Sequence, residues 1–229
     1  MANRITRKDL KQPDEFHTLS WRFIGFLASH RREVYLYSGI VVAMIAVILG
    51  WYLYGLHYES SAGEMYARAY GSYTRVQEDQ QNSDSTREAV GLYEELVKKY
   101  PSSEAAILAY YNLGNLYYSA ADMDKSIAAY RAYLEKSDKS SMLRGLAYYG
   151  LGYCYEAKKD YEKALKSFEN SEKNTLGTHF KIINYANAGR IYEKMGNVVK
   201  AVEYYKKVSG DDVDPFMKGL MKQKIANLS

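Results

Sequence analysis

The chain has 229 residues, a formal net charge of +4 and a single cysteine, Cys154. This length suits one membrane anchor and one compact domain, and so small a net charge does not by itself argue for a nucleic-acid partner. A lone cysteine excludes an internal disulfide and any zinc or haem-attachment motif that needs several cysteines. Only three prolines occur, which leaves room for long helices.

Residues 14–30 are the first predicted element, an amphipathic helix. On a helical wheel one face is apolar and consists of Phe16, Leu19, Phe23, Phe26 and Leu27. Pro13 and Asp14 suit its first turn. We interpret it as a helix on the cytoplasmic membrane surface, with docking against a partner helix as the alternative. The polar residues 1–12 carry four basic side chains that could touch anionic lipid: Arg4, Arg7, Lys8 and Lys11.

The next segment, 34–56, contains 23 residues without a charge. At about 1.5 Å per residue, such a helix can cross a hydrocarbon core of about 30 Å. Aromatic side chains lie near its two ends, as is typical at membrane interfaces: Tyr35, Tyr37, Trp51, Tyr52 and Tyr54. The alternative is a buried core helix, although a domain of the remaining size has no need of so long an uncharged one. We therefore predict a single transmembrane helix.

Charge near this helix predicts its orientation. Arg31 and Arg32 lie just before it, whereas no lysine or arginine follows until Arg68. By the positive-inside rule, residues 1–33 form a cytoplasmic tail and 57–229 lie on the opposite side. A cleaved signal peptide is the alternative, but both the leading segment and the apolar run are too long for a usual signal.

The remainder of the chain repeats itself. Gly114, Gly152 and Gly189 are spaced 38 and 37 residues apart, and aromatic residues keep the same spacing 16 positions later. A period of this size indicates stacked helix pairs. The predicted pairs are 105–136, 143–173 and 181–209, preceded by a weaker copy at 64–100 and followed by a capping helix at 214–228.

Each copy combines a helix start with a close helix contact. Ser85, Asp122, Asp160 and Asn197 recur at the same period and are predicted N-caps of the second helices. The glycine on each first helix should let the partner helix approach closely, with a small residue facing it: Ser126, Ala164 or Ala201. At the end of the stack, Gly210 suits a helix stop, Asp214 an N-cap and Pro215 a first helical position.

These residues resemble tetratricopeptide repeats, in which an aromatic residue, Leu-Gly and Tyr on the first helix precede Ala and Tyr or Phe on the second. The resemblance covers about residues 64–209 and implies an all-α solenoid of about four helix pairs. The period of 37–38 exceeds the usual length of about 34. The segment YEELVKKYPSSEAAILAYYNLGNLYY is similar to bacterial envelope members of this family.

One membrane-anchored group that the chain resembles is the ancillary subunit of the SecYEG translocon. That resemblance implies a bacterial inner-membrane protein with one span, a periplasmic C-terminal domain and a link to chaperones of exported proteins. The cytoplasmic tail here is longer than the short tail of that group. The alternative is a structural or assembly subunit of another large inner-membrane complex.

No catalytic set emerges from the sequence. His17, His30, His57 and His179 lie in segments that cannot converge, and no phosphate-binding glycine motif occurs. The acidic run of Asp211, Asp212 and Asp214 is interpreted as a solvated turn rather than a calcium site. Cys154 is interpreted as a buried structural thiol. We therefore predict a protein that is not an enzyme and has no cofactor, metal or small-molecule substrate.

The family resemblance implies that the first helices of the pairs line a groove for another protein or peptide. The groove residues that it predicts here are Tyr111, Asn115, Tyr118, Tyr149, Tyr153, Arg190 and Glu193. Tyrosine suits peptide recognition because it combines a large contact area with a polar tip. The alternative is that these tyrosines only fill the space between helices. Some relatives clamp a peptide carboxylate with lysine, but Tyr111 stands in place of that lysine, so no such clamp is predicted.

Overall fold

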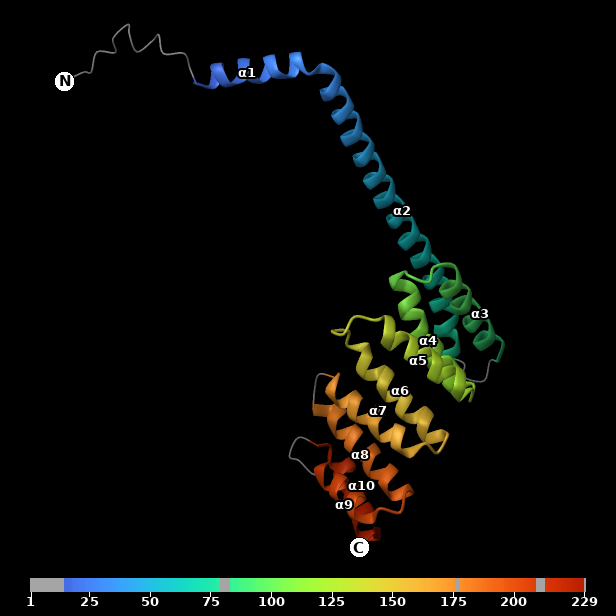
Figure 1. Ribbon diagram of the computed structural model, residues 1–229. Helices are drawn as coiled ribbons and strands as arrows, with labels where there is room; N and C mark the ends of the chain where they lie inside the picture. Colours follow the sequence, from blue (N-terminus) through green and yellow to red (C-terminus); the bar gives the residue numbers. More distant parts are fainter. Residues whose placement is uncertain (1–14, 79–82, 176–177, 209–212, 229) are drawn as a thin grey trace, which may run out of the picture. The chain divides into compact units, whose positions relative to one another are not determined.

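The computed structural model describes residues 15–78, 83–175, 178–208 and 213–228, and within them every regular element is a helix (Figure 1). The predicted all-α solenoid is confirmed. The chain divides into two compact units, residues 1–57 and 58–229. Several predictions lie outside the described residues. They concern Pro13, Asp14 and residues 1–12, the side chains of Phe16, Leu19 and His179, and the turn with Gly210, Asp211 and Asp212.

In the first unit, α1 (Glu15–Ser29) is followed by the start of α2 (Arg31–Glu78). Phe23 and Phe26 on α1 are 63% and 58% exposed, and Leu27 is partly buried. The only ring contact of Phe26 among the described residues is with His30, with centroids 4.5 Å apart. Most of the described apolar side chains of α1 are therefore open to solvent, lipid or a partner.

Helix α2 joins the predicted membrane helix to the first helix of the repeat domain without a break. No proline interrupts these 48 residues. Its segment Arg31–Val76 contains an apolar stretch long enough to cross a membrane, and none of that stretch is buried. Length and composition thus make α2 a candidate span, although a signal sequence would satisfy the same criteria.

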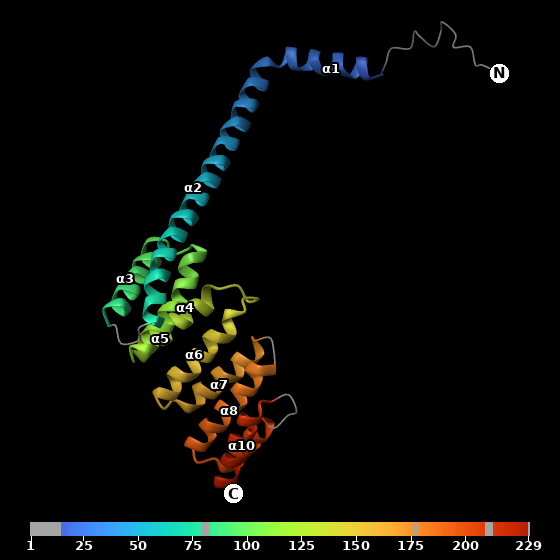
Figure 2. The same ribbon diagram turned by 180° about the vertical axis from the view of Figure 1, so that it is seen from behind.

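In the second unit the helices stack in pairs (Figures 1 and 2). The end of α2 packs with α3 (Ser83–Lys99), and the later pairs are α4 (Glu104–Ser119) with α5 (Met123–Lys136), α6 (Leu143–Ala157) with α7 (Tyr161–Lys173), and α8 (Thr178–Lys194) with α9 (Val198–Lys207). Helix α10 (Pro215–Leu228) packs against α9. Consecutive helices contact one another, so the core is a series of apolar layers between them.

Side-chain caps start the second helices of the last three pairs. Asp122, Asp160 and Asn197 each accept a hydrogen bond from the backbone amide three residues later, at 3.2, 3.3 and 3.2 Å. Ser85 is a correction, because α3 begins at Ser83 and Ser85 therefore lies inside its first turn. The run Ser83-Asp84-Ser85 offers several residue types that suit a helix start, but Ser85 lies two residues after the first residue of α3, where it cannot be the N-cap.

The repeated glycines make room for aromatic rings. A Cβ atom on Gly152 would lie 2.5 Å from a ring carbon of Phe168, and one on Gly114 or Gly189 would lie 2.6 Å from Tyr130 or Tyr205. The predicted close approach is therefore present, but the group nearest each glycine is the aromatic ring of the second helix. The small residue still contributes in the first of these pairs, where Ser126 Oγ donates a hydrogen bond of 2.7 Å to the Gly114 carbonyl.

Candidate partner-binding groove

A pocket of about 480 Å³ lies among α4, α5 and α6. Its lining residues are Tyr111, Asn115, Tyr118, Tyr130, Leu146, Tyr149, Gly150 and Tyr153. We call it the tyrosine groove. The α4 residues are separated by four and three positions and those of α6 by three, one and three, so each set projects from one helix face. Five of the seven predicted groove residues therefore lie around one pocket.

Hydrogen bonds hold the tyrosine groove in shape. Tyr130 Oη donates to Asn115 Oδ1 at 2.6 Å, and Asn115 Nδ2 lies 3.5 Å from Tyr73 Oη on α2. On the other wall, the hydroxyls of Tyr149 and Tyr153 lie 2.9 Å apart. Because these polar groups already have partners, the walls are preorganised rather than free to collapse.

Four of the groove tyrosines, Tyr111, Tyr118, Tyr130 and Tyr149, hold their protons more firmly than a free tyrosine does. Burial, followed by the hydrogen bond with Tyr153, raises the pKa of Tyr149 to about 12. Burial also raises the pKa values of Tyr111, Tyr118 and Tyr130. The pocket therefore offers ring surface and neutral hydroxyls, which suit an apolar side chain and the amides of a peptide backbone.

The same tyrosines also pack against the second helices. The ring of Tyr111 lies 6.1 Å from that of Tyr130, and the rings of Tyr149 and Tyr153 lie 6.0 and 5.4 Å from Phe168. Tyr118 is the most open of the set, at 38% exposed. The ring of each of these tyrosines packs between helices, and the same side chain also lines the groove, so the two interpretations do not exclude each other.

Arg190 lies beside the groove. Its guanidinium carbon lies 5.3 Å from the ring centroid of Tyr153, which donates a hydrogen bond of 3.2 Å to Asn187 Oδ1. Arg190 also donates to Glu156 Oε1 at 2.8 Å, and Lys194 donates to the same oxygen at 2.7 Å. Glu156 is only 7% exposed, so this pair of cations compensates a largely buried carboxylate.

Glu193, the seventh predicted residue, does not line the tyrosine groove. Its carboxylate accepts a hydrogen bond of 2.6 Å from Tyr205 on α9 and lies 3.1 Å from Lys224 Nζ on α10. These contacts lower the pKa of Glu193, the hydrogen bond from Tyr205 having the larger effect. Glu193 therefore connects α8 to both helices that follow it.

Sequence reasoning missed Tyr130, Leu146 and Gly150. Tyr130 belongs to the second helix of its pair, and its ring occupies the space that a Cβ on Gly150 would need. The glycine at 150, two residues before the repeated Gly152, was the available signal that a large side chain approaches α6 there.

The described residues present no catalytic arrangement. They contain no group of three or more His, Cys, Asp or Glu side chains that could hold a metal ion. Cys154 is fully buried with its sulfur 3.1 Å from Ser126 Oγ, and burial raises the pKa of its thiol. Asp214 accepts from the amide of Phe216 at 3.2 Å, which is a helix-capping contact.

Three solved structures with a similar fold are distant from this chain in sequence. The nearly identical TPR-like repeats of a kinesin-light-chain-type protein from Podosopora anserina align with a TM-score of 0.58 and 16% identity, over 71% of this chain and 86% of that one. The MamA protein aligns at 0.56 and 18%, over 72% and 81%. BtubC (BKLC) from P. vanneervenii aligns at 0.56 and 15%, over 75% and 82%. At these identities the likeness shows the fold alone.

A comparison with curated protein sequences finds no match to this chain. The family model described as "Tetratricopeptide repeat-like domain" matches residues 33–229, which include all of α2 except its first two residues and every later helix. That match agrees with the stacked pairs, the periodic caps and the glycine–aromatic contacts. The chain therefore belongs to the tetratricopeptide repeat-like domain family.

Proposed function

We propose that this protein is a membrane-anchored scaffold that binds a segment of another protein in the tyrosine groove. The fold is that of a protein-interaction module. The observation that carries the proposal is the preorganised pocket of about 480 Å³ between α4 and α6, walled by neutral tyrosines. Tyrosine rings bury a large area at small entropic cost, and they are enriched among the residues that dominate binding energies.

The anchor in this proposal is the uncharged segment 34–56 of α2. Its exposed apolar side chains support insertion into lipid, since no part of the apolar stretch is covered within the described residues. With Arg31 and Arg32 ahead of it, the N-terminus is cytoplasmic and the repeat domain periplasmic in a bacterial inner membrane. The partners that we propose are translocon components and the chaperones that serve exported chains.

A second candidate is a structural or assembly subunit of another large inner-membrane complex. The observation that favours it is the exposure of Phe23 and Phe26 on α1. This apolar surface would suit a helix of a neighbouring subunit as well as the membrane surface.

Photo-crosslinking in cells tests the groove. A photoreactive residue replaces Tyr111, Tyr149 or Tyr153 in turn, and the adducts are identified by mass spectrometry. Val199, an exposed position on α9 outside the pocket, serves as the control for chance encounters. Adducts with translocon components, chaperones or exported chains that are absent at Val199 are the expected result. A single subunit of a different membrane complex would favour the second candidate. Equal labelling at all four positions, or none in the groove, would contradict the proposal.

A further inference from the structure

The loop between α3 and α4, residues 100–103, lies against the part of α2 that belongs to the repeat domain (Figures 1 and 2). We call it the α3–α4 loop. The backbone amide of Ser102 donates to Tyr58 Oη at 3.3 Å, and that of Glu104, the first residue of α4, donates to Glu59 Oε2 at 3.2 Å. The loop is therefore fixed to two neighbouring side chains of α2.

Tyr58 lies close in the chain to the proposed anchor, since it follows the uncharged segment 34–56 by two residues. A residue spans at most about 3.6 Å, so chain length alone keeps the Cα of Tyr58 within about 7 Å of the end of that segment. Helix side chains also tilt toward the N-terminus of their helix, so Tyr58 and Glu59 reach back toward the segment. The headgroup layer beside a hydrocarbon core is about 5–7 Å thick. With segment 34–56 as the anchor, the α3–α4 loop thus lies at the level of the lipid headgroups.

The side chains around this loop suit a membrane interface. The rings of Tyr58 and Tyr100 meet edge to face with centroids 5.1 Å apart, and tyrosine is enriched at membrane–water interfaces. Lys98 and Lys99, the last two residues of α3, are exposed. Lys99 Nζ lies 5.4 Å from the ring centroid of Tyr100. Lysines beside a membrane can extend their ammonium groups to anionic headgroups.

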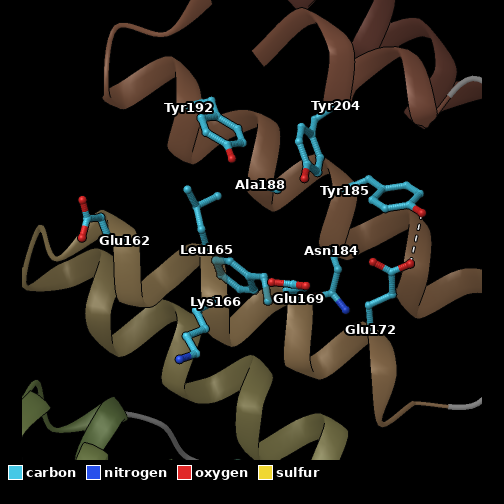
Figure 3. A pocket seen from close by; sticks show the side chains of 11 residues that line it. Glu162, Leu165, Lys166, Glu169, Glu172, Asn184, Tyr185, Ala188, Tyr192 and Tyr204 are labelled. Carbon is cyan, nitrogen blue, oxygen red and sulfur yellow. Dashed lines mark hydrogen bonds between the residues drawn. The ribbon is translucent and has the colours of Figure 1, made fainter. Parts of the chain in front are cut away.

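These two lysines have no ion pair within the described part of the chain. The pocket among α7, α8 and α9 in Figure 3 differs, because Glu169 there pairs with Lys173 at 2.7 Å and Glu172 accepts from Tyr185 at 3.1 Å. An external ion would have to displace those contacts.

The acidic neighbour of the α3–α4 loop is already engaged. The carboxylate of Glu59 accepts the amide of Glu104 at the N-terminus of α4, where the helix dipole favours negative charge. Its charge is therefore partly offset without either lysine, and the ammonium groups of Lys98 and Lys99 are left for an anion from outside the chain.

We propose that the α3–α4 loop is a lipid-contact surface of the repeat domain, on which Lys98 and Lys99 bind the phosphate groups of anionic phospholipids. This inference rests on the proposed membrane anchor and adds a second contact with the same membrane. A domain held at two points is restricted in its tilt relative to the bilayer.

Spin labels on the full chain in bilayer discs test the position of the loop. Ser102→Cys carries one label, and Ser119→Cys is the matched control, because it is exposed at the other end of the 16-residue α4, about 24 Å away. The native Cys154 is buried, and a sample without an added cysteine corrects for any label on it. A lipid with a nickel chelate on its headgroup should relax the label at 102 more strongly than the label at 119.

Equal relaxation at 102 and 119 in a chain that stays in the membrane after carbonate washing would overturn this inference and leave the anchor intact. Release by carbonate would instead contradict the anchor itself. The two failures are therefore distinguishable.

Native mass spectrometry of the full chain in detergent tests the lysines, with phosphatidylglycerol as the probe. Lys98→Gln with Lys99→Gln should weaken lipid binding about fivefold or more, the effect of one lysine at an anionic surface. Lys166→Gln with Lys222→Gln, which removes two exposed lysines of α7 and α10, should leave binding unchanged. Equal binding by the two double variants would show that Lys98 and Lys99 do not hold the lipid. Displacement of the lipid by an equal concentration of inorganic phosphate would identify a site for a free anion and overturn the lipid contact.

Discussion

At the scale of single residues, Tyr149 and Tyr153 both pack against a neighbouring helix and line the tyrosine groove. Their rings lie with edge-to-face geometry against Phe168, while their hydroxyls, 2.9 Å apart, line the tyrosine groove. Sequence reasoning set these two roles against each other as alternatives. Because a tyrosine ring is long enough to bury its base and present its tip, one residue can do both.

The raised pKa of Tyr149 predicts how stability responds to alkali. The phenol has a pKa of about 12 in the folded chain, against about 10 when unfolded. Between these two pH values Tyr149 is protonated in the folded state and ionised in the unfolded state. The protonated phenol therefore contributes fully to the free energy of unfolding below pH 10, and this contribution is lost as the pH rises through 12. Urea unfolding of the full chain in micelles at pH 9, 10 and 11, followed by circular dichroism, measures it.

The matched variant for this prediction is Tyr149→Phe, which removes the titrating hydroxyl. Its stability should fall less steeply between pH 10 and 11 than that of the unaltered chain. Absorbance at 295 nm, which follows phenolate formation, should also lose a late-titrating step. Parallel pH profiles of the two proteins would show that Tyr149 does not ionise in the way proposed.

At the scale of helices, close contact within each pair depends on a glycine opposite an aromatic ring. Gly152 with Phe168 repeats what Gly114 does with Tyr130 and Gly189 with Tyr205. The turns between these helices repeat as well: Ala121, Lys159 and Gly196 all have positive φ, at 59°, 60° and 74°, directly before the capping residues. Alanine and lysine give no sequence signal for this left-handed conformation, so only the structure revealed the shared turn.

Gly152→Ala tests the glycine–ring contact. The added methyl would lie 2.5 Å from Phe168, so a helix or ring must shift, and we expect a loss of about 1–3 kcal/mol in the free energy of unfolding. Gly91→Ala on α3 is the control, because no atom lies within 4 Å of its Cβ position. That variant should be neutral or gain up to about 1 kcal/mol from helix propensity. If chemical unfolding gives the same change in the free energy of unfolding for both variants, the close contact with Phe168 is not the reason that residue 152 must be glycine.

At the scale of the whole molecule, α2 places a candidate membrane span and the first repeat helix in one continuous helix. The predicted amphipathic helix, membrane surface contact and single span remain predictions, as does the assignment of the repeat domain to the periplasm. The match of the family model from residue 33 onward covers this whole helix apart from its first two residues.

Two leucine-to-lysine substitutions in the apolar segment test the anchor. Leu49→Lys with Leu53→Lys puts two charges in the predicted span, and a lysine there costs about 2.5–3.5 kcal/mol at the centre of a membrane helix and less towards its end. We expect the unaltered chain to stay with membranes after alkaline carbonate washing and the double variant to be released or degraded. The control is Lys136→Glu with Lys139→Glu, a double change in exposed charge within the repeat domain. Release of the unaltered chain by carbonate would contradict the membrane anchor.

The sequence by itself determined the features that depend on neighbouring residues. The helix pairs and the caps at Asp122, Asp160 and Asn197 follow from local periodicity. The family resemblance, rather than periodicity, predicted the groove positions, of which five lie around one pocket: Tyr111, Asn115, Tyr118, Tyr149 and Tyr153. Only the tertiary structure decided that Glu193 holds α9 and α10 and that Arg190 pairs with Glu156, 34 residues away. The reason is physical: periodicity states which face of a helix a side chain occupies, whereas its partner is set by how helices distant in sequence pack.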